Sequence, residues 1–149
     1  MGRKIGILTS GGDCGGLNAA IEAIVKSAHN EGWEVDGIKG GYEGLILNQI
    51  YTLTPDKVKG IHSQTGTILQ TSRVYPYNYS GTIDGREVMG QDVSQLMIEN
   101  SKRAGLEAII VCGGNGSLGL IPRLIKDHNP PITFIGIPFL SSTNFTSSW

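Results

Sequence analysis

The stretch KIGILTSGGDCGGLNA, residues 4–19, decides the fold of this 149-residue chain. Its first six residues form a short apolar run that ends in a Ser-Gly-Gly-Asp turn, which predicts a buried parallel strand followed by a tight loop. A helix is expected next, because apolar residues recur every three or four positions from Leu17 to Ala28, with Glu22, Lys26 and Asn30 on the polar face. Residues 33–38 alternate as a strand does, so the first forty residues predict a βαβ unit.

The same logic extends to the rest of the chain. Thr54-Pro55-Asp56 is typical of a helix start and predicts a short helix to about residue 61. Residues 71–85 are rich in Tyr, Asn, Pro and Gly and predict a long irregular loop. Further elements are expected as a helix over 91–104, a buried strand over 108–112, a helix over 117–127 and a strand over 132–137. Together they predict an α/β fold, an open and mostly parallel sheet with helices on both faces.

Composition excludes several function classes. Twelve basic residues against thirteen acidic ones leave a net charge of −1 with no basic run, so no nucleic-acid partner is expected. No run of about 18 apolar residues exists, which predicts no membrane partner and a soluble, cytoplasmic protein. Cys14 and Cys112 lack metal or redox spacing and are expected to be free thiols, and the three histidines are expected to be ordinary surface residues.

Two glycine clusters, at 11–16 and 113–116, each follow a predicted strand and open a predicted helix. Free backbone N–H groups and the helix dipole at such a point favour anions, and glycine lets the main chain approach phosphate oxygens. The alternative is that the glycines only make tight turns, but two such loops in one small sheet favour a phosphate ligand. Neither Gly-x-Gly-x-x-Gly at the first loop nor Gly-x-x-x-x-Gly-Lys-Ser/Thr anywhere is present, so Rossmann and P-loop sites are disfavoured.

Four blocks of sequence carry a resemblance to a known family. Residues 9–19, TSGGDCGGLNA, are similar to the opening loop of the phosphofructokinases. GYEGL at 41–45, GTILQTSR at 66–73 and VCGGNGS at 111–117 follow in the family's order. The chain thus resembles the N-terminal, nucleotide-binding portion of an ATP-dependent 6-phosphofructokinase from Lys4 through Pro138.

The resemblance implies ATP and Mg²⁺ as ligands. The positions that match the family's nucleotide site are Gly11, Gly12, Tyr42, Arg73, Val74, Gly114, Asn115, Gly116 and Ser117. Glycine at 116 favours ATP, because family members that use pyrophosphate usually carry an aspartate there. Asn115 replaces the aspartate that helps to hold Mg²⁺, so metal binding is expected to be weaker than in the family. Glu22 and Pro55 stand where bacterial members carry effector-binding arginines, so that regulation is not expected.

The end of the chain departs most from the family. Members continue after the strand that ends at Pro138 with Thr-Ile-Asp-Asn-Asp, whose first aspartate is the general base, whereas this chain has a Ser/Thr-rich tail over 139–149. Residues 1–138 are therefore expected to form an ATP-binding domain and residues 139–149 an irregular tail. No catalytic residue is assigned, because Ser141 and Ser142 have no base beside them. A frameshift and truncation of another origin are both left open.

The leading functional hypothesis is a glycolytic phosphofructokinase sequence whose intact form transfers the γ-phosphoryl of ATP to fructose 6-phosphate. The chain alone is expected to bind nucleotide and to catalyse little. The rival is a non-catalytic nucleotide sensor, or a subunit completed by a partner chain, and association into a homo-oligomer is left open. NAD and lipid kinases have similar second loops but lack the pattern at 9–19, and a purely structural α/β domain is the remaining alternative.

Overall fold

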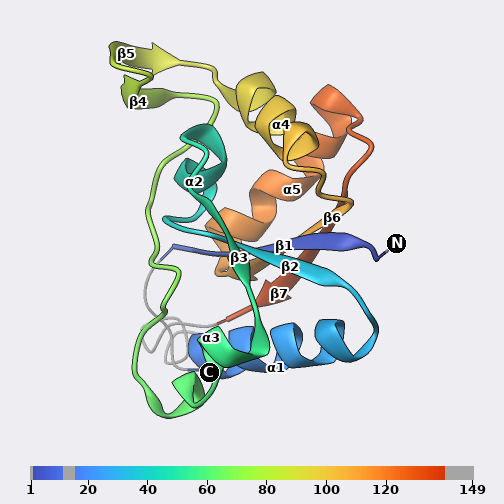
Figure 1. Ribbon diagram of the computed structural model, residues 1–149. Helices are drawn as coiled ribbons and strands as arrows, with labels where there is room; N and C mark the ends of the chain where they lie inside the picture. The colour runs from blue at the N-terminus through green and yellow to red at the C-terminus, as the bar shows by residue number, and fades with distance from the viewer. Residues whose placement is uncertain (1, 12–15, 140–149) are drawn as a thin grey trace, which may run out of the picture.

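The computed structural model describes residues 2–11 and 16–139. Strands and helices alternate along most of this length (Figure 1). The elements are β1 (Lys4–Ser10), α1 (Leu17–Asn30), β2 (Glu34–Ile38), α2 (Tyr42–Ile46), β3 (Ile50–Leu53), α3 (Pro55–Val58), the 3-10 turn η1 (Ile61–Ser63), β4 (Tyr79–Ile83), β5 (Arg86–Gln91), α4 (Ser94–Arg103), β6 (Ala108–Gly113), α5 (Asn115–His128) and β7 (Thr133–Pro138).

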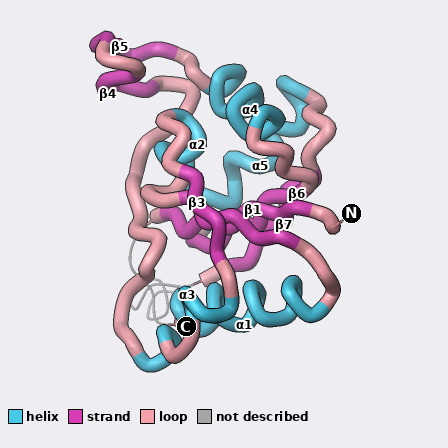
Figure 2. The backbone as a smooth tube through the Cα atoms, viewed as in Figure 1, coloured by secondary structure: helices cyan, strands magenta, loops and turns pink. Residues whose placement is uncertain are grey.

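A five-stranded sheet runs through the middle of the molecule in the order β3-β2-β1-β6-β7 (Figure 2). Its pairs β1–β2, β1–β6 and β6–β7 are parallel, and β3 is an antiparallel edge strand. Side chains from both faces of the central strands are buried, which explains why β1 and β6 are continuous apolar runs in the sequence. The predicted open, mostly parallel sheet is confirmed.

Helices cover both faces of this sheet, as predicted (Figure 1). On one face α1, α3 and η1 pack against side chains such as Ile7 and Val35. On the other face α2, α4 and α5 pack against side chains such as Leu8 and Val111. Alternation along β1 sends Ile7 and Leu8 to opposite faces, so each strand contributes to two apolar layers.

Glu22 is buried, which corrects its assignment to the polar face of the first helix. The residue is only 5% exposed, and its carboxylate accepts hydrogen bonds from Lys26 Nζ at 2.5 Å and from the backbone N–H of His62 at 2.9 Å. His62 Nδ1 lies 2.7 Å from the same carboxylate. Lys26 first and His62 second lower the pKa of Glu22 to about 2. The periodicity missed this because η1, not the sheet, covers Glu22.

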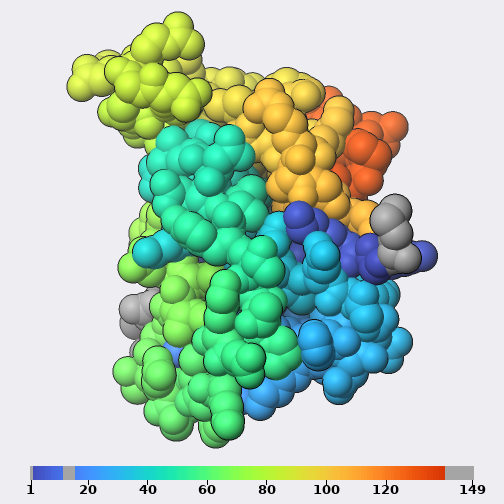
Figure 3. All heavy atoms as spheres, viewed as in Figure 1, coloured from blue at the N-terminus to red at the C-terminus, as the bar shows by residue number. Residues whose placement is uncertain are grey.

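The segment 71–85, expected to be irregular throughout, contains β4, which pairs antiparallel with β5. Asp84 and Gly85, with φ of 50° and 81°, make the turn between the strands, as Asp-Gly pairs commonly do. This hairpin stands out from the body of the molecule in the space-filling view (Figure 3). Because β5 extends to Gln91, the helix expected over 91–104 begins at Ser94, where the Asp92 carboxylate accepts the Ser94 N–H at 3.0 Å.

The expectations for the histidines and the cysteines are confirmed only in part. His29 and His62 are exposed as expected, but His128 is partly buried, with Nε2 lying 2.8 Å from Ser94 Oγ. Cys112 is a free and fully buried thiol, and burial raises its pKa to about 11. Cys14 lies outside the described residues. Cys112 is therefore a packing residue of the sheet.

Candidate nucleotide site

The candidate site lies where the order of strands reverses. β1 and β6 are neighbours in the sheet, but the chain continues from β1 to β2 on one side and from β6 to β7 on the other. Both strands end together, with Ser10 opposite Gly113. Open α/β sheets bind ligands in the crevice outside the carboxyl ends of strands at such a switch point.

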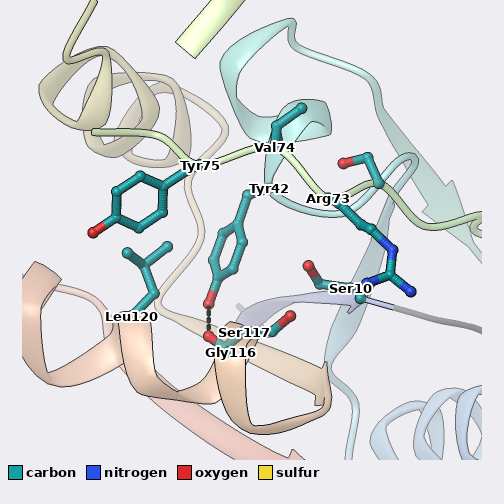
Figure 4. A pocket seen from close by; sticks show the side chains of 10 residues that line it. Ser10, Tyr42, Arg73, Val74, Tyr75, Gly116, Ser117 and Leu120 are labelled. Atoms are coloured by element: carbon teal, nitrogen blue, oxygen red, sulfur yellow. Dashed lines mark hydrogen bonds between the residues drawn. The ribbon is translucent and has the colours of Figure 1, made fainter. Parts of the chain in front are cut away.

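An open pocket of about 240 Å³ occupies this point (Figure 4). Segments far apart in the sequence contribute to it: the end of β1, the start of α2, residues 72–75 and the first turns of α5. The residues that line it are Ser10, Gly11, Tyr42, Ser72, Arg73, Val74, Tyr75, Gly116, Ser117 and Leu120. The two glycine loops therefore meet at one cavity.

Hydrogen bonds to the strand ends hold residues 64–75 beside the pocket. Thr9 Oγ1 donates to the Gln70 carbonyl at 2.8 Å, and the Gly11 N–H donates to the Ser72 carbonyl at 3.3 Å. The buried Asn18 side chain donates to the Gln64 carbonyl at 3.2 Å and accepts the Ile68 N–H at 2.8 Å. These bonds satisfy the polar backbone of a long connection and fix the position of Arg73.

The first turn of α5 forms one wall of the pocket. Gly114 precedes the helix, and no side chain of the described residues caps its N-terminus. The first N–H groups of α5 have no intrahelical partner, as at the start of any helix. The buried Tyr42 hydroxyl donates to the Ser117 carbonyl at 2.7 Å and joins α2 to this turn. Burial raises the pKa of Tyr42, so the hydroxyl keeps its proton and remains a donor.

Arg73 gives the pocket its positive charge. Its side chain is exposed and lies near Ser10 in Figure 4. No salt bridge to Arg73 forms among residues 2–11 and 16–139. Helical N–H groups at the start of α5 and a guanidinium at the same cavity make a site for an anion, phosphate above all.

Most of the residues singled out from the sequence meet in this cavity. Gly11, Tyr42, Arg73, Val74, Gly116 and Ser117 line it. Gly114 and Asn115 belong to the same loop and helix start but are not part of the lining, and Gly12 lies outside the described residues. The lining adds Ser10, Ser72, Tyr75 and Leu120. Leu120 could have been found, because it lies one helical turn after Gly116 and Ser117.

A self-contained metal site is absent from the described part of the chain, where no three His, Cys, Asp or Glu side chains gather. Asn115 is exposed at the first position of α5. Its amide oxygen is a suitable but neutral ligand for Mg²⁺. The described residues therefore fit a metal ion that arrives on phosphate groups better than a resident one.

Comparison with known proteins agrees with this geometry. Residues 4–147 match the family model described as Phosphofructokinase. The chain belongs to the phosphofructokinase family. The match extends beyond Pro138, where the resemblance read from the motifs stops.

Individual relatives give the extent of the likeness. The chain is 40% identical over 136 residues to the ATP-dependent 6-phosphofructokinase of Thermotoga neapolitana, covering 91% of this chain and 39% of the relative. It is 42% identical over 118 residues to ATP-dependent 6-phosphofructokinase 2 of Clostridium perfringens, covering 78% and 32%. The chain thus spans about two fifths or less of these relatives.

A solved structure confirms the fold. Pichia pastoris phosphofructokinase in the T-state superposes with a TM-score of 0.78 at 26% identity, covering 94% of this chain and 15% of that one. Among the described helices, none is long and apolar enough to cross a membrane. The family and the fold are therefore established, and the site assignments rest on the geometry above.

Proposed function

We propose that this chain is the donor-binding portion of an ATP-dependent 6-phosphofructokinase, and that the pocket between the two glycine loops binds MgATP. One observation carries the proposal: Arg73, which has no salt bridge among the described residues, and the first turn of α5, which no described side chain caps, line one cavity at the switch point of the sheet. Relatives about 40% identical are named as ATP-dependent enzymes, which supports ATP as the donor. The intact enzyme would transfer the γ-phosphoryl group to the 1-hydroxyl of fructose 6-phosphate.

Each proposed contact follows from the position of its residue. The N–H groups of Gly116 and Ser117 would donate to phosphate oxygens, and the Arg73 guanidinium would neutralise their charge. Mg²⁺ bound to the phosphates would share that task, with the Asn115 side-chain oxygen as a ligand. Gly11, Gly12 and Gly114 would let the backbone approach the phosphates.

Gly116 suits a nucleotide donor. A Cβ at this position would meet no atom of the described residues within 4 Å, so among them the space beside the helix start is open to a ligand. An aspartate here would place a negative charge in the space that the α-phosphate of ATP needs. Glycine therefore favours ATP over pyrophosphate.

Catalysis by the chain alone is proposed to be slight. Residues 139–149 contain no Asp or Glu, so this segment offers no carboxylate that could take the proton from the sugar hydroxyl. Fructose 6-phosphate would bind only where further residues complete the site. A cytoplasmic location and a homo-oligomeric state stay predictions.

A non-catalytic nucleotide-binding subunit is the second candidate. It is favoured by the same absence of acidic residues over 139–149 and by Asn115, which leaves the second loop without a charged metal ligand. Both candidates require the nucleotide to bind in the same pocket. They differ in turnover once a complementary chain is present.

Isothermal titration with MgATP, together with a coupled assay for fructose 1,6-bisphosphate, tests the proposal. We expect saturable binding and no turnover above background. Arg73→Gln should weaken binding, because it removes the positive charge of the pocket, whereas Arg86→Gln on the exposed hairpin is a matched control that should not. Absence of saturable MgATP binding would refute the proposed function, and turnover at an ordinary kinase rate would refute the proposed lack of a base.

A further inference from the structure

The pocket has an apolar end that the phosphate contacts do not use. The lining includes Ser10, Gly116, Ser117, Tyr75 and Leu120, and in Figure 4 Tyr75 and Leu120 lie to one side of Tyr42 whereas Ser10 lies to the other. In Figure 4 the Tyr75 ring lies beside the Leu120 side chain. Tyr75 is 46% exposed, so a large part of this aromatic side chain is open to a ligand.

Arg123, on the next turn of α5 after Leu120, holds the Tyr75 ring in place. Its guanidinium Nη1 donates a hydrogen bond to the Tyr75 hydroxyl. The same guanidinium lies 3.6 Å from the centre of the Tyr77 ring, and its Nε lies 3.5 Å from Asp127 Oδ2. An arginine held at both a ring face and a carboxylate is a rigid donor, which reduces the freedom of the tyrosine that it contacts.

Tyr77 completes the support. Its ring centre lies 5.8 Å from that of Tyr75, tilted by 48°, and 6.4 Å from that of His128 in a stacked arrangement. Burial first, and the Asp127 carboxylate second, raises the pKa of Tyr77 to about 12. Tyr75 is thus supported by the Tyr77 ring and tethered to Arg123 through its hydroxyl.

We propose that Tyr75 is a specificity-determining residue that stacks on the nucleobase of the phosphoryl donor, with Arg123 as its positioning residue. The inference rests on the proposed function and extends it to donor selection. A flat base gains from a ring already fixed beside the cavity, because no side-chain freedom is lost when it binds. A donor that consists of phosphate alone reaches Arg73 and α5 but has nothing to place against Tyr75.

The test compares ATP with inorganic tripolyphosphate, which carries the phosphates without the base, by titration calorimetry of the 149-residue chain. Tyr75→Ala should weaken ATP binding about tenfold and leave tripolyphosphate binding unchanged. Tyr75→Phe keeps the ring but loses the hydroxyl that Arg123 contacts, so ATP should bind about threefold more weakly than to wild type, less of a loss than in Tyr75→Ala. Tyr51→Ala, at another exposed tyrosine, is the matched control and should change neither ligand.

Arg123→Lys tests positioning separately from charge. Lysine keeps the positive charge but lacks the planar guanidinium, so ATP should bind about threefold more weakly and tripolyphosphate equally well. A purely electrostatic role for Arg123 would leave both affinities unchanged. Circular dichroism and the urea unfolding midpoint verify folding, and Tyr75→Leu, which keeps apolar bulk without a flat ring, replaces Tyr75→Ala if that variant is unfolded.

The outcomes separate this inference from the proposed function. If wild-type protein binds ATP tightly but Tyr75→Ala and Tyr75→Leu bind it as well as wild type, the stacking role is wrong and the ATP pocket stands. Equal weakening of ATP and tripolyphosphate would likewise overturn it. If the wild-type chain binds neither ligand, the pocket is not a phosphate site and both proposals fail.

Discussion

Two glycines three residues apart in the second loop behave in opposite ways. A Cβ on Gly113, at the end of β6, would lie 2.5 Å from the backbone oxygen of Ser10 on β1. A Cβ on Gly116, in the first turn of α5, would meet no atom within 4 Å in the part of the chain that the structure describes. Gly113 therefore allows two strands to approach at the switch point, whereas Gly116 leaves space for a ligand. We call β1, β6 and the connection 64–75 beside them the frame of the pocket, and the first turn of α5 its wall. Substitutions in the frame should lower stability, whereas substitutions in the wall should change ligand binding.

Gly113→Ala should have the largest effect on the frame. The added methyl group clashes with backbone, which cannot rotate away, and we expect the free energy of unfolding to fall by about 3 kcal/mol. Gly116→Ala is the matched control and should leave that free energy unchanged or raise it by up to about 1 kcal/mol, because alanine favours helix. Urea denaturation measures both.

Equal losses for the two alanine variants would contradict the distinction between frame and wall. The same holds if Gly113→Ala is as stable as wild type. In that event the approach of β1 to β6 would not depend on the absence of a side chain.

Asn18→Ala should be the next most damaging change to the frame. The buried amide joins α1 to two backbone groups of the 64–68 segment, and its loss leaves the Ile68 N–H without its partner. A cost of about 1–3 kcal/mol is expected by urea denaturation. A cost below about 0.5 kcal/mol for Asn18→Ala would show that these two bonds do not stabilise the connection.

Gly116→Asp should separate binding from stability. The new side chain enters open space, so the unfolding free energy should stay within about 0.5 kcal/mol of wild type. The carboxylate repels phosphate, and we expect ATP to bind at least about tenfold more weakly by titration calorimetry. Undiminished ATP affinity in a folded Gly116→Asp variant would place the phosphates elsewhere.

The low pKa of Glu22 predicts a smaller, pH-dependent effect on stability, far from the pocket. Its pKa in the folded protein, about 2, lies below the ordinary value of 4.5, so its stabilisation is complete above 4.5 and is lost as pH falls from 4.5 towards 2. The difference in thermal midpoint between wild type and Glu22→Gln should therefore shrink over this range. A difference independent of pH would show that the charge of Glu22 does not contribute.

The sequence predicted the central architecture because its signals are local. β1, α1 and β6 carry strong periodicity or continuous apolar runs, and the glycines that end β1 and β6 indicate the two loops at the switch point. The Asp84-Gly85 turn was also a local signal, although the Pro and Tyr residues around it obscured the hairpin. Such features need no knowledge of distant contacts.

The features that the sequence did not predict depend on contacts between distant segments. Glu22 is buried only because η1, about forty residues away, packs over it. Ser72 and Tyr75 join the pocket through hydrogen bonds from Thr9 and Gly11 to a connection that has no periodicity. Periodicity describes which face of one element is apolar, but not which other element will cover it.

The most direct test of the central claim is to follow the backbone amide NMR signals of the chain during titration with MgATP. A phosphate site between the two glycine loops predicts that Gly11, Gly116 and Ser117 shift most, with Arg73 and Tyr75 shifting at the other wall of the pocket. Shifts concentrated elsewhere, such as around Trp33 and Ile135, which line a separate pocket, or no shifts at saturating MgATP, would contradict the account.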